Sequence, residues 1–577
     1  MSKTSNFDAK IKAILDAIKP GERTCAITGE KWFMDEEEIG WYKHFNVPSV
    51  KITHNMLWKH MAYYDLGYQF WWNKHFETGK PILTVHHPAS GICVLPDVEW
   101  HDRDFSNINL DYSASEPFFT QLRKLQVQIP LPANHNVTEP HNSIALLSFG
   151  DRNSYFVFGC ISKNSFYSVG AMNTEGSSLV SLSSNITNSH HISHSNRIFN
   201  CYYASESRDC MDSAFIFDCH NCQYCFGASN KRNKKYLWFN EQLSETEWRQ
   251  KRELVDFGKR SELYNWRKKF DQLLFDSGIW PENFNTGSSD SSGDYLTGAV
   301  RCHHCFGAED TAVDAYCSAW IFGNPQTNIF MWGILDSSNS YMSVTSPKSN
   351  QIKFCNRITQ CDTCEYCMSC VNCSNCFGCI GIKRKEFCIF NKQYSESEYW
   401  QRVDELKCAM LDRGEYGQYF PTEMSTTFVP ECGAVVYAGA SEADLELLGG
   451  QRFDVNADGA VAKYDETKLK NAADVPDSID DVGDDWVGVP IYDEKAKRAF
   501  AYLKPELEHY RRVRIAPPTE HFISRVNAVT HSGQVACLEN KKCAKCDQAI
   551  LTSKNPTYPN RTIYCKPCYF AYLEQNG

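Results

Sequence analysis

Several features that would assign this chain to a common class are missing. No run of about 18 consecutive apolar residues occurs, so no membrane span is expected. The net charge of −11 gives no overall basic excess, which counts against a dedicated nucleic-acid-binding protein. We also expect no secretory signal peptide, because residues 7–19, FDAKIKAILDAIK, predict a short amphipathic helix instead.

Common catalytic motifs are missing as well. The sequence has no phosphate-binding glycine loop, G-x-S-x-G elbow, HExxH helix or dinucleotide fingerprint. An enzyme whose active-site residues are scattered along the chain would escape this search. We therefore rank an enzymatic function last without excluding it.

Cysteine is abundant, with 27 residues, and its densest run is CDTCEYCMSCVNCSNCFGC at 361–379. A period of three matches neither the 3.6-residue turn of a helix nor the two-residue alternation of a strand. It fits a chain that turns often and directs one small side chain inward from each short side, as in a β-solenoid. Seven cysteines form this column: Cys361, Cys364, Cys367, Cys370, Cys373, Cys376 and Cys379.

We interpret the cysteine column first as a buried structural element, because a free cysteine is a compact apolar side chain. A thiolate–metal cluster is the alternative. Disulfides fit least, because the cysteine total is odd and neighbours three residues apart cannot all pair. A reducing cytoplasm is the expected setting.

The same signature recurs upstream. The segment CQYCFGASNKRNKKYLWFNEQLSETEW (222–248) aligns without gaps on CSNCFGCIGIKRKEFCIFNKQYSESEY (373–399), at an offset of 151. Cys219, Cys222 and Cys225 therefore join the predicted column. In each copy a serine, Ser244 or Ser395, precedes a glutamate by three residues, which predicts a capping box opening a helix that covers the end of a solenoid.

The most specific chemical signal lies near the end of the sequence. Cys543-x2-Cys546 and Cys565-x2-Cys568, with 18 residues between the pairs, have the spacing of a zinc ribbon. All four ligand positions are filled, so a structural Zn²⁺ is expected. At an offset of 468 the N-terminal region carries a similar module, with His75, Thr78, Asp97 and Trp100 at the four positions. That set predicts a module that kept its fold and lost its metal, unless His86, His87 or His101 rescues the site.

Two further stretches have a charged character. Between Lys231 and Lys269 there are 12 Lys and Arg against 6 Asp and Glu, interleaved with tryptophans, which predicts a solvated cap helix or a nucleic-acid contact. The candidates for that contact are Lys231, Arg232, Lys234, Lys235, Arg249, Lys251 and Arg252. Residues 441–490 are acidic, and Asp454–Asp465 resembles an EF-hand loop without the final glutamate, so we expect a surface loop there with Ca²⁺ binding as the alternative.

The order of these parts resembles a family of large cysteine-rich proteins from ultra-small bacteria of the candidate phyla radiation (Patescibacteria). The matching stretches are CAITGEKW…WYKHFNVP, EPFFTQLRKLQVQIPLP, CFGCIGIKRKEFCIFNKQYSESEY, VPDSIDDVGDDW and LKPELEHYRR…CAKC…YCKPC. The resemblance implies the architecture and a cytosolic setting, and it supplies no reaction. In that family the end modules usually carry a further Cys-Pro-x-Cys segment; here it is replaced by THNMLW and EHFISR, so a second zinc is not expected.

Together these patterns predict a mainly β protein with two cysteine-rich β-solenoid lobes, helical caps and zinc-ribbon-like modules at both ends. The predicted divisions are 1–112 (N-terminal module), 113–143 (linker helix), 144–285 (lobe 1), 286–415 (lobe 2), 416–490 (acidic linker) and 491–577 (zinc-ribbon module). The first functional hypothesis is a non-catalytic scaffold that binds a protein partner, with homo-oligomers also considered. The alternatives are a nucleic-acid- or ribosome-associated protein and a metal-storage or redox protein.

Overall fold

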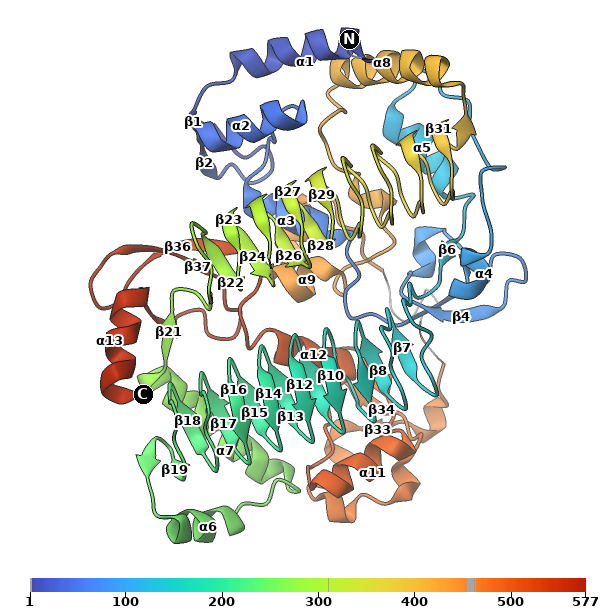
Figure 1. The fold of residues 1–577 in the computed structure, drawn as a ribbon. Helices are drawn as coiled ribbons and strands as arrows, with labels where there is room; N and C mark the ends of the chain where they lie inside the picture. Colours follow the sequence, from blue (N-terminus) through green and yellow to red (C-terminus); the bar gives the residue numbers. More distant parts are fainter. Residues whose placement is uncertain (1–2, 310, 454–460, 462) are drawn as a thin grey trace.

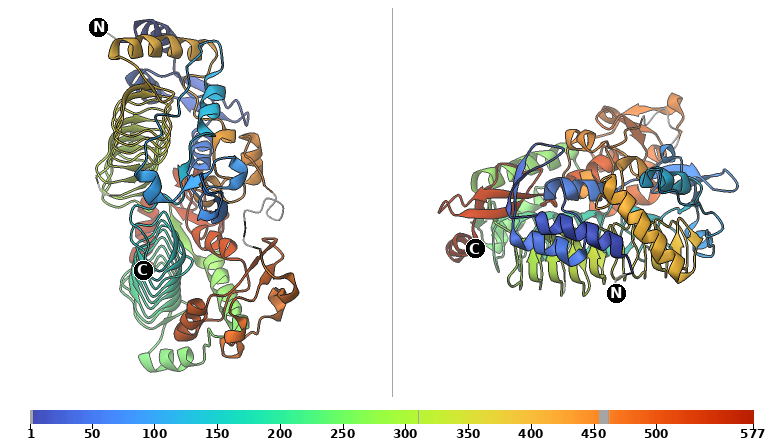
Figure 2. Two further views of the ribbon diagram at one scale, coloured as in Figure 1. Left: turned by 90° about the vertical axis from the view of Figure 1, so that its right-hand side faces the viewer. Right: turned by 90° about the horizontal axis from the view of Figure 1, so that it is seen from above.

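The computed structural model describes residues 3–309, 311–453, 461 and 463–577. It is rich in β-structure, and most strand pairs in the two central stacks of coils are parallel. Figures 1 and 2 show the two stacks one above the other, with helices and hairpins along one side. In the part of the chain that is described, no helix is both long and apolar enough to cross a membrane.

Stack 1 runs from β7 (Ile144–Leu146) to β20 (Glu241–Gln242). Its parallel strands pair at intervals of 12 residues, so that Ile186 lies beside Ile198 and Ile198 beside Cys210. Two larger sheets result, with strand orders β16-β14-β12-β10-β9 and β11-β13-β15-β17-β18-β19-β20, and β7 pairs with β8 at the start of the stack. The strands between β7 and β20 are β8 (Tyr155–Phe158), β9 (Ser162–Lys163), β10 (Met172–Glu175), β11 (Ser178–Ser181), β12 (Ser184–Thr187), β13 (His190–Ser193), β14 (Asn196–Phe199), β15 (Tyr202–Ser205), β16 (Arg208–Met211), β17 (Ala214–Phe217), β18 (Phe226–Ser229) and β19 (Leu237–Trp238).

Stack 2 runs from β22 (Gly293–Leu296) to β32 (Lys392–Gln393). Its first coils form two four-stranded parallel sheets, and its middle coils are joined by single bridges such as Asn350 to Asp362, again 12 residues apart. Its last strands form the three-stranded sheet β30-β31-β32. The remaining strands are β23 (Val300–His303), β24 (Cys305–Ala308), β25 (Val313–Tyr316), β26 (Ala319–Phe322), β27 (Gln326–Ile329), β28 (Trp332–Leu335), β29 (Ser338–Tyr341), β30 (Ser374–Phe377) and β31 (Glu386–Ile389).

The backbone explains the period of three in the sequence. In stack 1 a left-handed residue recurs at every third position, as at Asn185 (φ 59°), Asn188 (φ 47°) and His191 (φ 59°). The next residue in each case faces inward and is buried, namely Ile186, Ser189 and Ile192. Asparagine and aspartate tolerate this conformation better than most residues, which accounts for their abundance at the corners.

Each stack is followed by a helix of the predicted kind. The helix α6 (Glu245–Glu253) begins after β20 and α8 (Glu396–Asp412) begins after β32. Both have a complete capping box, formed by Ser244 with Glu247 and by Ser395 with Glu398, as predicted. These two helices start 151 positions apart.

The two end modules contain corresponding elements at a separation of 468 positions. The helix α2 (Glu36–Phe45) corresponds to α11 (Lys504–Val513), and α3 (His54–Tyr63) corresponds to α12 (Phe522–Thr530). Hairpins follow in both, β3 (Trp71–Lys74) with β4 (Pro81–Thr84) and β36 (Leu538–Lys542) with β37 (Ala549–Ser553). A final helix completes each module, α4 (Asp97–His101) or α13 (Lys566–Asn576).

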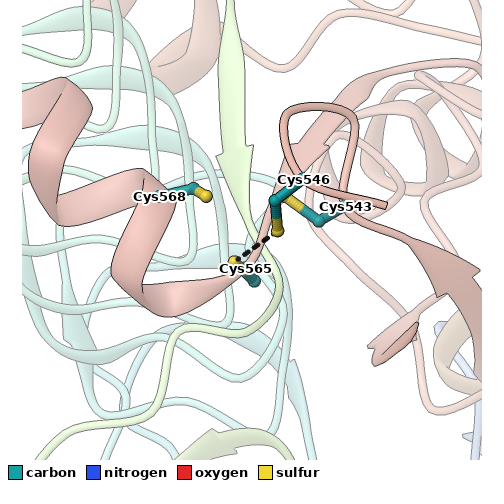
Figure 3. Close-up of side chains that lie close together, drawn as sticks. All are labelled: Cys543, Cys546, Cys565 and Cys568. Carbon is teal, nitrogen blue, oxygen red and sulfur yellow. Dashed lines mark hydrogen bonds between the residues drawn. The ribbon is translucent and has the colours of Figure 1, made fainter. Parts of the chain in front are cut away.

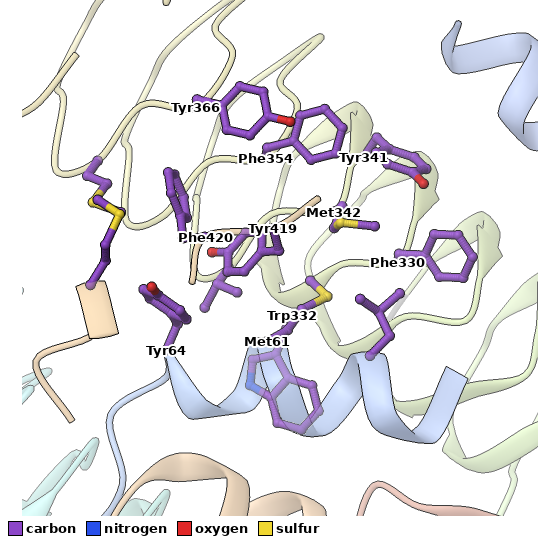
Figure 4. Packing of buried hydrophobic residues seen from close by; sticks show 14 of the residues in the cluster. Met61, Tyr64, Phe330, Trp332, Tyr341, Met342, Phe354, Tyr366, Tyr419 and Phe420 are labelled. Carbon is purple, nitrogen blue, oxygen red and sulfur yellow. The ribbon is translucent and has the colours of Figure 1, made fainter. Parts of the chain in front are cut away.

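The helices of each end module pack on the stack that is distant in sequence. Trp58 on α3 donates from Nε1 to the Cys317 carbonyl of stack 2 (2.7 Å). Figure 4 shows Met61 of α3 on the side of the helix that faces the aromatic residues of that stack, and Tyr64, the residue after the helix, beside Phe420. On the other side, the Tyr167 hydroxyl of stack 1 donates to Glu506 of α11 (2.7 Å). The C-terminal helices therefore cover stack 1, while the N-terminal ones cover stack 2.

Short segments connect these parts. The predicted helix in EPFFTQLRKLQVQIPLP is α5 (Phe118–Gln126), and it is followed by β6 (Leu131–Pro132), which pairs with β5 (Val94–Leu95). In the other half α7 (Arg260–Ser277) precedes β21 (Ile279–Pro281), which pairs with β38 (Thr562–Tyr564). The acidic region includes α10 (Glu442–Leu447), and its later part buries Val475, Ile479 and Val482 against Leu507 and Tyr510 of α11.

Candidate metal centre

The four cysteines predicted as a ribbon lie together in the C-terminal module. Cys543 and Cys546 lie in the turn between β36 and β37, Cys565 is the residue that precedes α13, and Cys568 lies in the first turn of that helix. Their Sγ atoms all lie within 4.8 Å of one another, and Cys546 Sγ is 3.6 Å from Cys565 Sγ. Figure 3 shows the four side chains converging from the hairpin and the helix. The group could hold a metal ion.

The turn that carries Cys543 is shaped to present its sulfur. The Cys543 N–H donates to the Gln548 carbonyl (2.8 Å), the Asp547 N–H returns to the Cys543 carbonyl (2.9 Å), and the Lys545 N–H points to Cys543 Sγ (3.4 Å). Burial alone would raise the pKa of Cys543, but the backbone N–H groups of Cys565, Lys545 and Cys546 lower it to about 6. Cys543 and Cys565 are buried, whereas Cys546 is exposed. Four cysteine ligands leave no open coordination position, so the centre suits a structural ion rather than a catalytic one.

The centre lies at the junction of the two stacks. Beside it, β38 pairs with β21, the segment that leads into stack 2. The helix α13 contacts the end of stack 1, where the Tyr569 hydroxyl donates to the buried Asp218 carboxylate and the Lys231 ammonium donates to the Asn576 carbonyl. Tyr569 directly follows Cys568, but its partner is 351 positions away, so no local pattern could have identified this contact.

The N-terminal module has the same turn without cysteine. The His75 Nδ1 atom accepts from the N–H groups of Glu77 (3.2 Å) and Thr78 (3.3 Å), as Cys543 Sγ does from Lys545. Gly79 (φ 67°) and Asp547 (φ 60°) occupy the same left-handed position of the two turns. A nitrogen acceptor thus takes the place of the sulfur.

The other two positions of this module also have structural partners. The Asp97 carboxylate accepts the N–H groups of residues 134 to 136, at 2.8–3.2 Å. Trp100 is 2% exposed and donates from Nε1 to the Pro130 carbonyl (3.0 Å), and Lys383 Nζ lies 3.9 Å from its ring centroid. The module is held here by hydrogen bonds and aromatic packing.

The histidines considered as a rescue do not form a metal site with this module. His86 is hydrogen-bonded to Thr426 (2.7 Å) and to His135 (3.1 Å), and the His87 Nδ1 atom accepts the Ala89 N–H (3.1 Å). His101 packs against the Trp100 ring. Within the described ranges, the four C-terminal cysteines are the one group of three or more ligands arranged to hold an ion.

The cysteine column is buried and faces the backbone. Its seven sulfurs from Cys361 to Cys379 lie 3.3–3.5 Å from the carbonyl two residues earlier and 3.4–3.8 Å from the carbonyl nine residues later. Cys219, Cys222 and Cys225 of stack 1 make the same two contacts, at 3.4–3.8 Å. A carbonyl oxygen favours a protonated thiol, which can donate, over a thiolate. Burial also raises the pKa of Cys367 and Cys370 well above the usual thiol range, whereas hydrogen bonds from neighbouring thiols lower the pKa of Cys364 and Cys373.

Most of the cations proposed for nucleic-acid contact are already engaged. Arg232 pairs with Asp218 (2.9 Å), Arg249 pairs with Glu245 (2.7 Å), and Lys231 binds the Asn576 carbonyl. Lys251 and Arg252 lie over the rings of Trp238 (5.5 Å) and Phe257 (4.8 Å). Lys234 and Lys235 make no ion pair with any residue that the structure describes.

The EF-hand-like stretch lies largely outside the described residues. Asp465, its last position, is described and accepts the N–H and hydroxyl of Thr467 at 3.1 Å and 2.6 Å. That residue therefore begins a short 3₁₀ turn, and the remainder of the calcium prediction stays untested.

Comparison with known protein families finds no matching family model, and no curated protein sequence matches the chain.

Proposed function

We propose that the protein is a non-catalytic scaffold in which two β-solenoids are joined by one structural zinc ion and bind a macromolecular partner. The observation that carries this proposal is the position of the cysteine tetrad, which fixes α13 against stack 1 and β38 against the segment entering stack 2. An ion there would stabilise the junction of the two stacks without an open position for substrate.

The sulfur geometry supports zinc as the ion. A tetrahedral site with Zn–S bonds of about 2.3 Å places its sulfurs about 3.8 Å apart. The 3.6 Å between Cys546 and Cys565 is close to that separation. Four thiolates from two Cys-x2-Cys pairs are the ligand set of many structural zinc sites. The large number of free thiols favours a reducing compartment such as the cytoplasm.

The test is elemental analysis of protein purified without added metal, combined with a count of reactive thiols before and after denaturation. The scaffold predicts about one zinc per chain, with the column thiols reacting only after denaturation. Several metal ions per chain would reject it in favour of metal storage or redox chemistry. Zero zinc in a folded protein would reject the proposed role of the tetrad.

Nucleic-acid binding is the second candidate, and a specific observation supports it. Lys234 and Lys235 make no ion pair in the described part of the chain, and the half-buried ring of Trp238 in the same segment lies 5.5 Å from the Lys251 ammonium. Binding through these cations predicts a gel shift of RNA or single-stranded DNA that weakens as salt rises. Absence of any shift at low salt would reject this candidate.

A further inference from the structure

The last coils of the two stacks end on the same pair of residues. These are Phe239 and Asn240 in stack 1, and Phe390 and Asn391 in stack 2. The backbones match closely, with φ angles of 49° and 68° in the first pair and 44° and 67° in the second. In both, the asparagine Oδ1 atom accepts an N–H from the preceding coil, from Ser229 (2.9 Å) or Ile380 (2.8 Å).

In stack 2 this edge is covered by an extended segment of the N-terminal module. The Leu110 N–H donates to the Phe390 carbonyl (3.1 Å), and Asn391 Nδ2 donates to the Ile108 carbonyl (3.0 Å). With Phe118 of α5 also stacked on the Phe390 ring (5.4 Å between centroids), Phe390 is 0% exposed and Asn391 is 2% exposed. The segment therefore binds the last coil mainly through its backbone, as a peptide does when it extends a sheet edge.

Charge fixes the register of that segment. The Asp104 carboxylate accepts the Lys383 N–H (3.1 Å) and lies 3.5 Å from Lys385 Nζ. Farther along, Asp111 pairs with Lys392. The apolar residues Ile108 and Leu110 therefore lie between two acidic residues that bind lysines of stack 2.

In stack 1 the end of α13 lies beside Lys231 and Arg232, but the Phe239–Asn240 part of the edge has no such cover among the described residues. The Phe239 carbonyl accepts no hydrogen bond there, and Asn240 Nδ2 makes one, to Ser229 Oγ (3.0 Å). Phe239 and Asn240 are only half-buried. Lys234 corresponds to Lys385, and it forms no ion pair with an acidic residue in the described ranges.

The surroundings of this edge suit an apolar chain with negative charge. The rings of Trp238 and Trp266 lie beside Phe239 and are themselves only partly buried. Lys269 Nζ lies 4.2 Å from the Trp266 ring centroid, which adds positive charge to this wall. One position differs, because Glu241 stands where stack 2 has Lys392.

We propose that the last coil of stack 1 is a docking site for an extended segment of a partner protein, of the form Asp-x3-Ile-x-Leu. The partner's backbone N–H would donate to the Phe239 carbonyl, and its carbonyl would accept from Asn240. The acidic residue would pair with Lys234. The inference rests on the proposed scaffold function, and it identifies the partner as an extended polypeptide. The internal segment has Asp111 after its leucine, whereas the partner should have a basic residue there, because that residue would face Glu241.

The probe is a fluorescent peptide with the sequence of residues 102–113, DRDFSNINLDYS, added to the full-length protein under reducing conditions. Fluorescence anisotropy should rise to saturation. Replacing both apolar residues of the peptide (Ile108→Asp, Leu110→Asp) should weaken binding by tenfold or more, which corresponds to a loss of about 1.4 kcal/mol or more in binding free energy. A peptide with Asp111→Lys should bind more tightly than the original, because it would face Glu241.

Variants of the protein locate the site. Asn240→Ala and, separately, Lys234→Glu should each weaken peptide binding, with Lys234→Glu acting on the surface and leaving the fold intact. Lys348→Glu, an exposed lysine of stack 2, is the matched control and should have no effect. Absence of saturable binding would overturn the proposal, as would binding that survives both stack 1 variants or that is lost only with Asn391→Ala. Such a failure alongside one zinc per chain and buried thiols would reject this docking site and leave the scaffold proposal standing.

Discussion

The two end modules have corresponding helices and hairpins but are held together differently. In the C-terminal module four cysteines converge within 4.8 Å. In the N-terminal module the same positions carry His75, Thr78, Asp97 and Trp100, whose side chains or N–H groups are hydrogen-bonded to the backbone or to one another. The same arrangement of turn and helix is thus held by hydrogen bonds and packing in one module, while in the other it carries four cysteines that could hold a metal ion.

Removal of metal should reveal the largest difference in stability between the two modules. Cys565→Ser, or treatment with a zinc chelator, should unfold β36, β37 and α13, because a structural zinc contributes roughly 10–16 kcal/mol to the folding of isolated zinc-finger peptides. Hydrogen exchange followed by mass spectrometry should show lost protection there and unchanged protection in β3 and β4. Equal loss in both hairpins, or in neither, would contradict this comparison. Cys408→Ser, which changes a thiol outside the tetrad, is the control.

The part of this architecture that the sequence could predict is the part that depends on local spacing. The ribbon follows from two Cys-x2-Cys pairs, and the buried column follows from the period of three, which the left-handed residue at every third position of the stacks explains. The packing of each module on the distant stack could not be predicted. Contacts such as Trp58 with Cys317 join residues 259 positions apart, and such pairs leave no local pattern.

Trp100→Ala tests the module without cysteines. This side chain is 2% exposed, and its loss removes packing, a hydrogen bond to Pro130 and the contact with Lys383. We expect a loss of about 3–5 kcal/mol in the free energy of unfolding of this module, measured by urea denaturation. Phe570→Ala, at a ring that is 52% exposed on α13, should cost far less. A similar cost for both variants would show that Trp100 does not replace the metal.

The contact between Asp294 of β22 in stack 2 and Gln534 of the C-terminal module should make the stability of the protein depend on pH. Asp294 accepts from Gln534 (2.5 Å), and burial raises its pKa to about 6. Because the folded value exceeds the unfolded value of about 3.9, the protonated form is favoured in the folded state. Its stabilisation is full below about pH 4 and is lost as the pH rises through about 6, a change of roughly 3 kcal/mol.

Asp294→Asn isolates this group from the other titrations. The difference in stability between the variant and the natural protein, measured by chemical denaturation from pH 4 to pH 7.5, should change by roughly 3 kcal/mol across that range. The natural protein should lose stability relative to the variant as the pH rises. A difference that stays constant with pH would show that Asp294 is ionised with its usual pKa in the folded protein.

His75→Cys should have the smallest effect, and it tests whether one ligand position can be exchanged alone. A cysteine sulfur can accept the N–H groups of Glu77 and Thr78 that His75 Nδ1 now accepts, as Cys543 does for Lys545. We expect stability within about 1 kcal/mol of the natural protein. The zinc content should not increase, because Thr78, Asp97 and Trp100 cannot complete a closed tetrahedral site with it. A second zinc per chain in this variant would mean that the N-terminal module still has a preformed metal geometry, and that its hydrogen bonds are secondary to that geometry.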